Sequence, residues 1–211
     1  MEQETLFTAS KWEILKLLSE QQLSPIELAA RSGTSVANVS QQLRLLEMAG
    51  LVKSERVPNR DKGQPRILYS LAGNHSFLIA TANDFVEKKH VPLSAYNKVI
   101  LKIWFSGRHE LHYALEKAFW SIEHHLPKID ALAIDESAAH PRFVILSRDH
   151  ELGKRLAPVS ITDPSGATHD VTFTTLHSDK PGKELPRSLY ILYDPGTIIP
   201  ALLKEEGVKK K

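Results

Sequence analysis

The 211-residue sequence contains no cysteine, and its charges nearly cancel. Without cysteine the chain forms no disulfide scaffold and carries no CxxC redox pair, thiolate zinc site or cysteine nucleophile. Any metal site would need histidine and carboxylate ligands. Because 27 lysines and arginines stand against 25 aspartates and glutamates, bulk charge favours neither nucleic acid, a membrane nor an acidic partner.

Long apolar runs are also missing from the sequence. No stretch approaches about 18 uncharged apolar residues, and residues 1–4 carry two glutamates where a secretion signal would be basic. We therefore expect a cytoplasmic protein without membrane contact. Since domains commonly have roughly 100 to 200 residues, the length suits one large domain or two small ones, and we favour two.

In the first third of the chain, helix-capping and turn-forming residues divide the sequence into three predicted short helices followed by two predicted strands. Apolar residues at helical spacing predict a helix from about Ser10. A second begins with Ser24 as cap, Pro25 at its first position and Glu27 three residues after the cap, and ends near residue 31. After the turn at Gly33, a third is expected at 35–49, with strands at 51–56 and 66–71 joined by a polar turn.

This order of elements is that of a winged helix-turn-helix. Val39, Leu43 and Leu46 share one side of the third helix, which leaves a small, polar face outward. Glutamine and arginine there suit paired hydrogen bonds to adenine and guanine in the major groove. Residues 35–71 carry six basic against three acidic side chains. The predicted DNA-binding residues are Ser35, Val36, Ala37, Asn38, Ser40, Gln41, Arg44, Arg56, Arg60, Lys62 and Arg66.

Residues 10–71 resemble the ArsR-type winged-helix transcription regulators of bacteria and archaea. The resemblance lies in WEILKLLSE, LSPIELAARSGTSVANVSQQLRLLEMAGLV and PRILYSL. It implies a DNA-binding, usually dimeric regulator whose third helix enters the major groove, and it favours repression. Metal-sensing members carry a cysteine box in the second helix. Here that helix reads ELAAR, which excludes thiolate sensing of arsenic, cadmium or lead.

The remaining sequence predicts three further segments. Phe77, Leu78, Ala82 and Phe85 share one helical face, so we expect a connecting or dimerisation helix at 76–92. Residues 93–205 are predicted to form an α/β effector or oligomerisation domain, and residues 206–211 a basic tail. The helices of the α/β domain are expected at 93–105, 110–126 and 149–156, and its strands at 129–134, 143–146, 159–162, 171–176 and 189–193. The predicted fold class is α+β: a winged helix-turn-helix at 1–75, then a small α/β domain.

Three patterns in the second domain could indicate functional sites, but each is more typical of ordinary surface or structural residues. His109, His112 and Glu116 share a helical face and could bind zinc or nickel together with His124 or His125 of a second subunit, but this spacing is only a weak indication of a metal site. Asp130 and Asp135 are too far apart along the chain for the D-x-D pair of a nucleotidyltransferase. Basic residues at 142, 148, 154 and 155 suit an anionic ligand or a solvated face. We predict no catalytic site, metal or cofactor.

The sequence therefore predicts a homodimeric, sequence-specific transcription regulator whose partners are double-stranded DNA and an unidentified small-molecule or protein effector. Two alternatives remain. One is a winged-helix scaffold in a larger complex, which would lack salt-dependent affinity for duplex DNA. The other is a DNA-tethered, nucleotidyltransferase-like enzyme, which would need clustered carboxylates and a bound metal.

Overall fold

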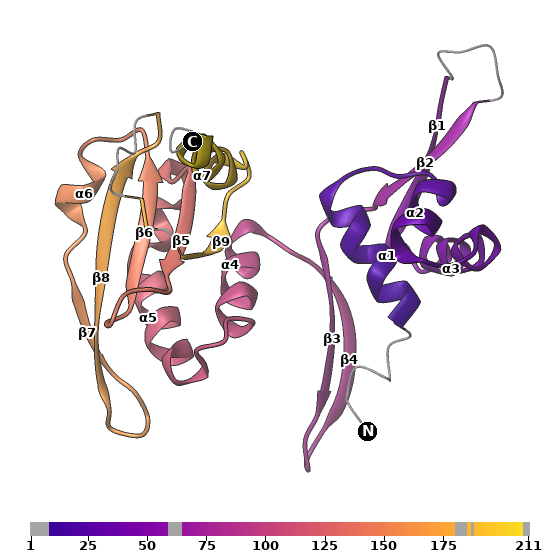
Figure 1. Ribbon diagram of the computed structural model, residues 1–211. Coiled ribbons are helices and arrows are strands. Elements are labelled where there is room, and N and C mark those ends of the chain that lie inside the picture. Colours follow the sequence, from indigo (N-terminus) through magenta and orange to yellow (C-terminus); the bar gives the residue numbers. More distant parts are fainter. Residues whose placement is uncertain (1–8, 59–64, 180–184, 187, 209–211) are drawn as a thin grey trace. The chain divides into compact units, whose positions relative to one another are not determined.

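The computed structural model describes residues 9–58, 65–179, 185–186 and 188–208 (Figure 1). The chain divides into two compact units, Met1–Pro92 and Leu93–Lys211, which are described separately below. Within the described ranges, no helix is both long and apolar enough to cross a membrane.

The first unit begins with the predicted three helices and two-stranded wing. Its elements are α1 (Ala9–Glu20), α2 (Pro25–Ser32), α3 (Val36–Met48), β1 (Val52–Val57) and β2 (Arg66–Leu71). Strands β1 and β2 pair antiparallel, with Val52 opposite Leu71. The three helices bury their apolar faces in one core, which includes Ile14, Leu28, Val39 and Leu43. The predicted winged helix-turn-helix is confirmed.

Local chemistry explains why α2 and α3 begin and end where they do. The Ser24 hydroxyl accepts from the Glu27 amide, and the Glu27 side chain accepts from the Ser24 amide, which forms a capping box. Gly33 ends α2 in the left-handed conformation, at φ 66°, which a side chain with a Cβ adopts at a cost. Ser35 then caps α3 by accepting from the Asn38 amide at 3.2 Å.

The predicted helix at 76–92 is wrong: this segment is an antiparallel hairpin of β3 (His75–Thr81) and β4 (Val86–Pro92). Asn83 and Asp84 are turn-forming residues, and the Ala82 amide donates to the Phe85 carbonyl at 2.8 Å to close the tip. Short apolar runs do not distinguish helix from strand by spacing alone. Here the β-branched residues and the turn outweigh the helical spacing.

The second unit is built on a five-stranded mixed sheet in the order β7-β8-β6-β5-β9. The strands are β5 (Ala131–Asp135), β6 (Arg142–Ser147), β7 (Val159–Thr162), β8 (Thr168–His177) and β9 (Leu189–Tyr193). Strands β6 and β8 run parallel, and the other pairings are antiparallel. Every residue of β5 is buried, as the sequence predicts for a central strand covered on both faces.

Helices cover both faces of this sheet. One core joins it to α4 (Ala95–Trp104) and α5 (His112–Ile122) and includes Leu132 and Phe143. A second core joins the other face to α7 (Ile198–Val208) and includes Ala133 and Val144. The α/β part of the predicted fold class is therefore confirmed. A short helix, α6 (Leu152–Arg155), follows β6.

Two helical segments of the second unit differ from expectation. The helix expected at 110–126 is divided into η2 (His109–Leu111), α5 and η3 (Glu123–Lys128), and Pro127 lies inside η3. Helix α7 was not predicted, and its third residue is Pro200. Proline is tolerated there because first-turn amides have no partner within the helix. The Asp194 carboxylate instead accepts from the amides of Ile198 and Ile199 at 2.8 and 2.9 Å.

Candidate nucleic-acid interface

The outward face of α3 is the centre of the candidate interface. Val39, Leu43 and Leu46 are buried in the core of the first unit. Helical geometry therefore turns the opposite side outward, and the predicted residues Val36, Ala37, Ser40, Gln41 and Arg44 are all exposed. The capping residue Ser35 is exposed as well. The structure thus brings together the α3 residues that the sequence nominated.

Asn38 differs from the other nominated residues because its side chain is engaged within the domain. Its amide nitrogen donates to the Thr34 hydroxyl at 3.0 Å, and its oxygen accepts from the Gln42 amide at 3.3 Å. Asn38 is also only partly exposed. These contacts link the turn to the first turns of α3, so they fix the position of the helix start.

The wing is joined to the helices by contacts that the sequence did not reveal. The backbone amides and carbonyls of Leu23 and Tyr69 exchange two hydrogen bonds, at 3.1 and 2.8 Å, which tie β2 to the residue before α2's cap. On β1, the Ser54 hydroxyl donates to the Glu47 carboxylate at 2.7 Å. The wing is therefore attached to both ends of the helix-turn-helix segment.

Tyr69 is the main residue of this region that sequence reasoning missed. Partial burial, together with the negative charge of Glu47, raises the pKa of its hydroxyl, and the positive charge of Arg44 opposes that change. The phenol therefore stays neutral and lies within electrostatic reach of the predicted base-reading arginine. The period-two pattern of β2 could have placed Tyr69 on an inner face, but not beside α3.

The basic residues nominated on the wing have different surroundings. Arg56 lies exposed on β1. Arg66 lies on β2, and its guanidinium donates to the Glu27 carboxylate at 3.0 Å. Hydrogen bonds from Ser24 first, and then the Arg66 contact, lower the pKa of Glu27. Arg66 therefore already has an anionic partner at the start of α2. Arg60 and Lys62 lie outside the described residues.

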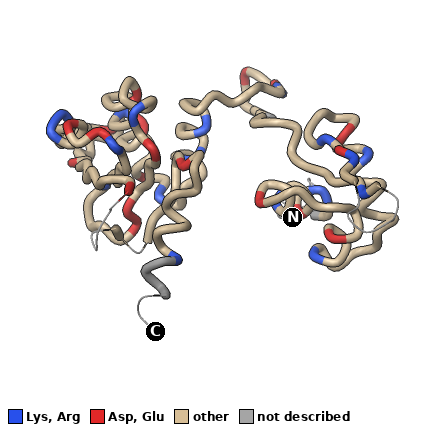
Figure 2. Tube along the Cα trace, turned by 90° about the horizontal axis from the view of Figure 1, so that it is seen from above, with Lys and Arg blue, Asp and Glu red and all other residues tan. Residues whose placement is uncertain are grey.

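Figure 2 shows lysine and arginine positions interspersed with aspartate and glutamate in both units. Along the described part of the trace, charges of one sign do not gather in a single region of either unit. The case for the α3 face therefore depends on which side chains are exposed and on helix geometry more than on local charge.

The candidate sites weighed in the second unit have partners of their own. His112 Nε2 lies 3.1 Å from the Ser106 carbonyl, and Glu116 accepts from the Trp104 indole at 3.3 Å. Within the described residues, no group of three or more histidines and carboxylates has the geometry to hold a metal ion.

The two aspartates weighed for phosphoryl transfer flank β5. Asp130 precedes the strand and accepts from the Ser178 hydroxyl. Asp135 ends it, is buried, and lies 3.6 Å from Arg142. Five residues of strand span roughly 16 Å, so these carboxylates do not share a metal ion.

Comparisons with known proteins agree with the architecture of the first unit. Residues 9–54 match the family model described as bacterial regulatory protein, arsR family. These residues therefore form an ArsR-type helix-turn-helix, as predicted, and the match supports a DNA-binding transcriptional regulator. A comparison with curated proteins gave no match.

Two solved structures are similar to parts of the chain. One is a ZitR mutant from Lactococcus lactis in complex with DNA, 31% identical over 33% of this chain and 46% of that chain, with a TM-score of 0.28. The chain thus covers less than half of ZitR. The other is the ferric uptake regulator from Francisella tularensis with iron, 22% identical over 45% of this chain and 74% of that chain, with a TM-score of 0.25.

Proposed function

We propose, from the ArsR-type helix-turn-helix at residues 9–54, that this protein is a sequence-specific DNA-binding transcription regulator. The observation that carries the proposal is the outward face of α3, where Ala37, Gln41 and Arg44 are exposed one turn apart. Gln41 and Arg44 supply base-edge hydrogen bonds in the major groove, and Ala37 lets the helix approach the bases closely.

Phosphate contacts would position this helix on the duplex. The Ser35 cap uses the Asn38 amide, and helix geometry leaves the amides of Val36 and Ala37 without intrahelical partners. These two groups, at the positive end of the helix dipole, suit a phosphate. Ser40 and Arg56 add polar and positive groups along the α3 face and the wing.

We propose further that the protein is a homodimer and that the β3–β4 hairpin forms its contact. Within the described residues each strand pairs only with the other, and an isolated two-stranded hairpin is at best marginally stable. On β3, Leu78 and Ile79 are 44% and 53% exposed. Lys88 and Lys89 lie opposite them on β4 and protect that edge from pairing. The uncharged β3 edge is thus the one suited to pair with its own copy.

The α/β unit would then serve as an effector or oligomerisation module. A ligand there regulates DNA binding only if its affinity differs between the DNA-competent and incompetent states of the dimer. The wide separation of Asp130 and Asp135 speaks against the nucleotidyltransferase alternative, and a non-enzymatic role is therefore part of the proposal.

Fluorescence anisotropy tests the DNA-binding proposal. The full chain is titrated onto duplex from upstream of its own gene and onto scrambled duplex, at two salt concentrations. Arg44→Ala is expected to weaken specific binding by about 5- to 150-fold, which corresponds to about 1 to 3 kcal/mol for a paired base contact. Arg108→Ala, in the second unit, removes the same charge and serves as the control.

Two results would count against this function. Equal affinity for both duplexes would favour an architectural role, and absent binding would favour the scaffold alternative. If Arg44→Ala and Gln41→Ala leave affinity and sequence preference unchanged, α3 is not the reading helix.

Light scattering after size exclusion tests the dimer. The wild-type chain should have twice the monomer mass. A Leu78→Lys, Ile79→Lys double variant should be monomeric because successive residues of a strand point to opposite faces, so lysines of the two copies would repel one another on both faces of the paired β3 strands. Ile26→Lys, at an exposed apolar position on α2, should remain dimeric. A monomeric wild type, or a dimeric hairpin variant, would refute this contact.

A further inference from the structure

Four large aromatic side chains are exposed on the helical layer of the second unit. They are Trp104 and Phe105 at the end of α4, and Tyr113 and Trp120 on α5, and they are between 40% and 76% exposed. Two of the protein's three tryptophans are among them. Tryptophan and phenylalanine are largely buried in most proteins, so their exposure together points to an interaction surface.

The aromatic residues of α5 belong to a regular stripe. Tyr113, Glu116, Lys117 and Trp120 have the spacing i, i+3, i+4 and i+7, so they share one side of the helix. The other side carries the buried residues, such as Phe119. The Lys117 ammonium lies over both rings, 4.0 Å from the Trp120 centroid and 5.4 Å from the Tyr113 centroid. The stripe is therefore continuous, with one acid and one base at its middle.

The end of α4 extends this stripe. Helices α4 and α5 pack against each other, and the Trp104 indole joins them by donating to the Glu116 carboxylate at 3.3 Å. Phe105 follows the buried Ile103 by two residues, which turns Phe105 to the outer side of the helix end. The stripe together with Trp104 and Phe105 is called the aromatic face below.

The aromatic face is large enough to bind a protein. Since a buried aromatic side chain covers roughly 150 to 250 Å², the exposed parts of the four rings amount to about 300 to 500 Å². Patches of this size on a monomer are often functional. Two such faces in contact would bury about 600 to 1,000 Å² of aromatic surface, and the side chains around them bring the total near the roughly 1,200 Å² of a small specific interface.

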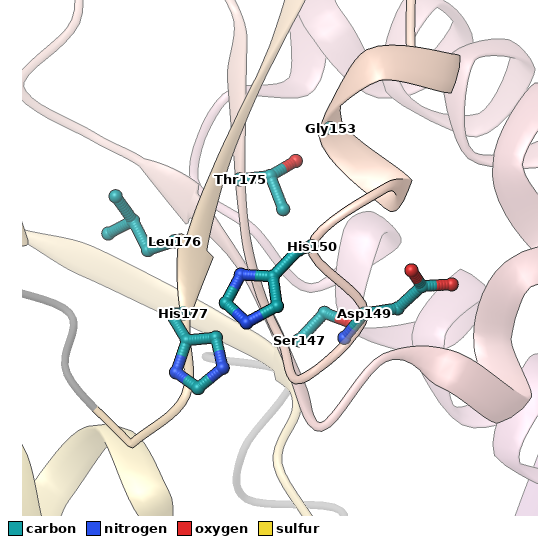
Figure 3. A pocket seen from close by; sticks show the side chains of 7 residues that line it. All are labelled: Ser147, Asp149, His150, Gly153, Thr175, Leu176 and His177. Carbon is teal, nitrogen blue, oxygen red and sulfur yellow. The ribbon is translucent and has the colours of Figure 1, made fainter.

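The aromatic face is separate from the small pocket of the second unit. That pocket, of about 110 Å³, lies at the carboxyl ends of β6 and β8, where the rings of His150 and His177 stack (Figure 3). Its seven lining residues belong to β6, β8, α6 and the segment before α6. The aromatic face is instead an exposed surface on two helices, which suits another protein surface better than a small molecule.

The charges on and around the aromatic face cancel. The stripe itself holds one acid and one base. At the edges of the face, Arg108 pairs with Glu110 at 3.3 Å, and the exposed Lys98 of α4 is balanced by the exposed Glu123 after α5. A surface without net charge fits neither the phosphates of nucleic acid nor an anionic membrane. An apolar surface with a balanced polar rim is typical of a contact between proteins.

We propose that the aromatic face binds the same face of a second copy of this chain, with the two α5 helices antiparallel about a twofold axis. In such a contact every pairing of two residues occurs twice, once in each direction. With the axis midway between Glu116 and Lys117, Tyr113 lies opposite Trp120 of the second copy, and Glu116 lies opposite Lys117 of the second copy. The stripe is thus complementary to itself, ring against ring and acid against base.

This contact deepens the homodimer proposed above and depends on it for its strength. The hairpin contact joins the first units of two chains, and α4 begins three residues after β4 ends. A second contact between chains that are already joined is intramolecular, with an effective concentration on the order of millimolar for a short connection. A face of modest area, too weak to hold two separate chains together at micromolar concentration, therefore adds to the stability of the dimer.

The test measures the dissociation constant of the full-chain dimer by sedimentation. Glu116→Lys places lysines opposite one another at two symmetric points and should raise the dissociation constant at least about tenfold. The double variant Glu116→Lys, Lys117→Glu restores acid opposite base and should return the constant to within about threefold of the wild-type value. Glu55→Lys, at an exposed position on β1 of the first unit, makes the same change of charge and is the control.

Tryptophan fluorescence gives an independent measurement on the same face. In a Trp12→Phe background, the remaining tryptophans are Trp104 and Trp120, and quenching by acrylamide reports how far solvent reaches them. Quenching should be weak in the dimer. It should become strong when dilution, or the Leu78→Lys, Ile79→Lys substitutions in the hairpin, produces monomers at micromolar concentration.

Three results overturn the proposal. If acrylamide reaches the tryptophans equally in monomer and dimer, no second copy covers the face and its partner is a different protein. If the tryptophans are shielded in the monomer, another part of the same chain covers them. If Glu116→Lys changes the dissociation constant no more than Glu55→Lys does, or if the double variant does not recover, the α5 helices do not meet in this register.

These results are separable from those on the hairpin and on DNA. A hairpin variant that stays dimeric with shielded tryptophans refutes the hairpin contact and leaves the α5 contact as the dimer interface. A wild-type dimer with open tryptophans refutes the α5 contact alone, and a chain that is monomeric throughout refutes both. If the protein binds no DNA, the regulator proposal fails, and the quenching measurement still decides what covers the aromatic face.

Discussion

Replacement of Ser24 by alanine should lower the stability of the first unit by about 1 to 2 kcal/mol. Ser24 is only 7% exposed, its hydroxyl donates to the Glu27 carboxylate at 2.6 Å, and its oxygen accepts from the Glu27 amide at 3.4 Å. Loss of a capping serine costs about 0.5 to 2 kcal/mol. The upper part of this range applies because the substitution removes the acceptor of the partly buried Glu27 amide and one of the two Ser24 donors to the Glu27 carboxylate.

Differential scanning calorimetry measures this effect. In a domain of this size, 1 kcal/mol shifts the midpoint by about 4 to 8 °C, so Ser24→Ala should lower one transition by roughly 5 to 15 °C. Ser94→Ala is the matched control, because Ser94 caps α4 in the second unit by accepting from the Asn97 amide at 3.1 Å. It should lower the other transition.

Two outcomes would refute the reasoning behind this pair. If Ser24→Ala leaves the midpoint unchanged, the capping box does not stabilise α2. If both variants shift a single transition equally, the two compact units unfold together and cannot be treated as independent.

Three further predictions concern single contacts in each unit. The folded-state pKa of Glu27 is lowered, so the carboxylate contributes fully to the free energy of unfolding above the unfolded pKa of about 4.5, and this contribution is lost as pH falls through the lower folded value. In denaturant titrations at several pH values, Glu27→Gln should therefore reduce the loss of stability at acidic pH, and an unchanged pH dependence would contradict the reasoning. Gly33→Ala should destabilise the first unit by about 1 to 2 kcal/mol because of the positive φ at this position alone, since a Cβ there meets no atom within 4 Å. Gly33→Asn should recover part of that loss in the same titration, and equal losses for the two variants would argue against a conformational cause. Phe119→Ala, at a fully buried position, should cost the second unit about 3 to 5 kcal/mol in urea unfolding; a loss below 1 kcal/mol would show that its core is not packed as described.

The first unit was predictable from sequence because its boundaries depend on local chemistry. The cap at Ser24, the proline after it, Gly33 and the cap at Ser35 each act within a few residues of their own position. The burial of Val39 and Leu43 follows from helical spacing, and so does the exposure of Gln41 and Arg44. The engagement of Arg66 by Glu27 joins residues 39 apart in sequence, and no local pattern indicates it.

The second unit was less predictable because its architecture depends on contacts between residues that are distant in sequence. Its central strands were recognisable as apolar runs, but their order in the sheet depends on pairings between distant segments. The pocket residues His150 and His177 are 27 positions apart and meet only because β6 and β8 are neighbours in parallel. For residues 75–92, spacing suggested a helix because Phe77 and Phe85 fall two turns apart by coincidence, whereas the hairpin is decided by its turn residues and strand propensity.

The pairing of β5 with β9 has a consequence for the order in which the chain folds during its synthesis. Ala133 lies opposite Ile191, so the edge of the sheet stays open until the ribosome has added almost sixty further residues. The winged helix closes its contacts within residues 9–71, and local contacts form faster than distant ones. A nascent chain would thus present a folded helix-turn-helix while the apolar strand β5 still lacks β9, its neighbour on one side. We therefore expect chaperones to bind the nascent chain at that stage, in the second half of the sequence.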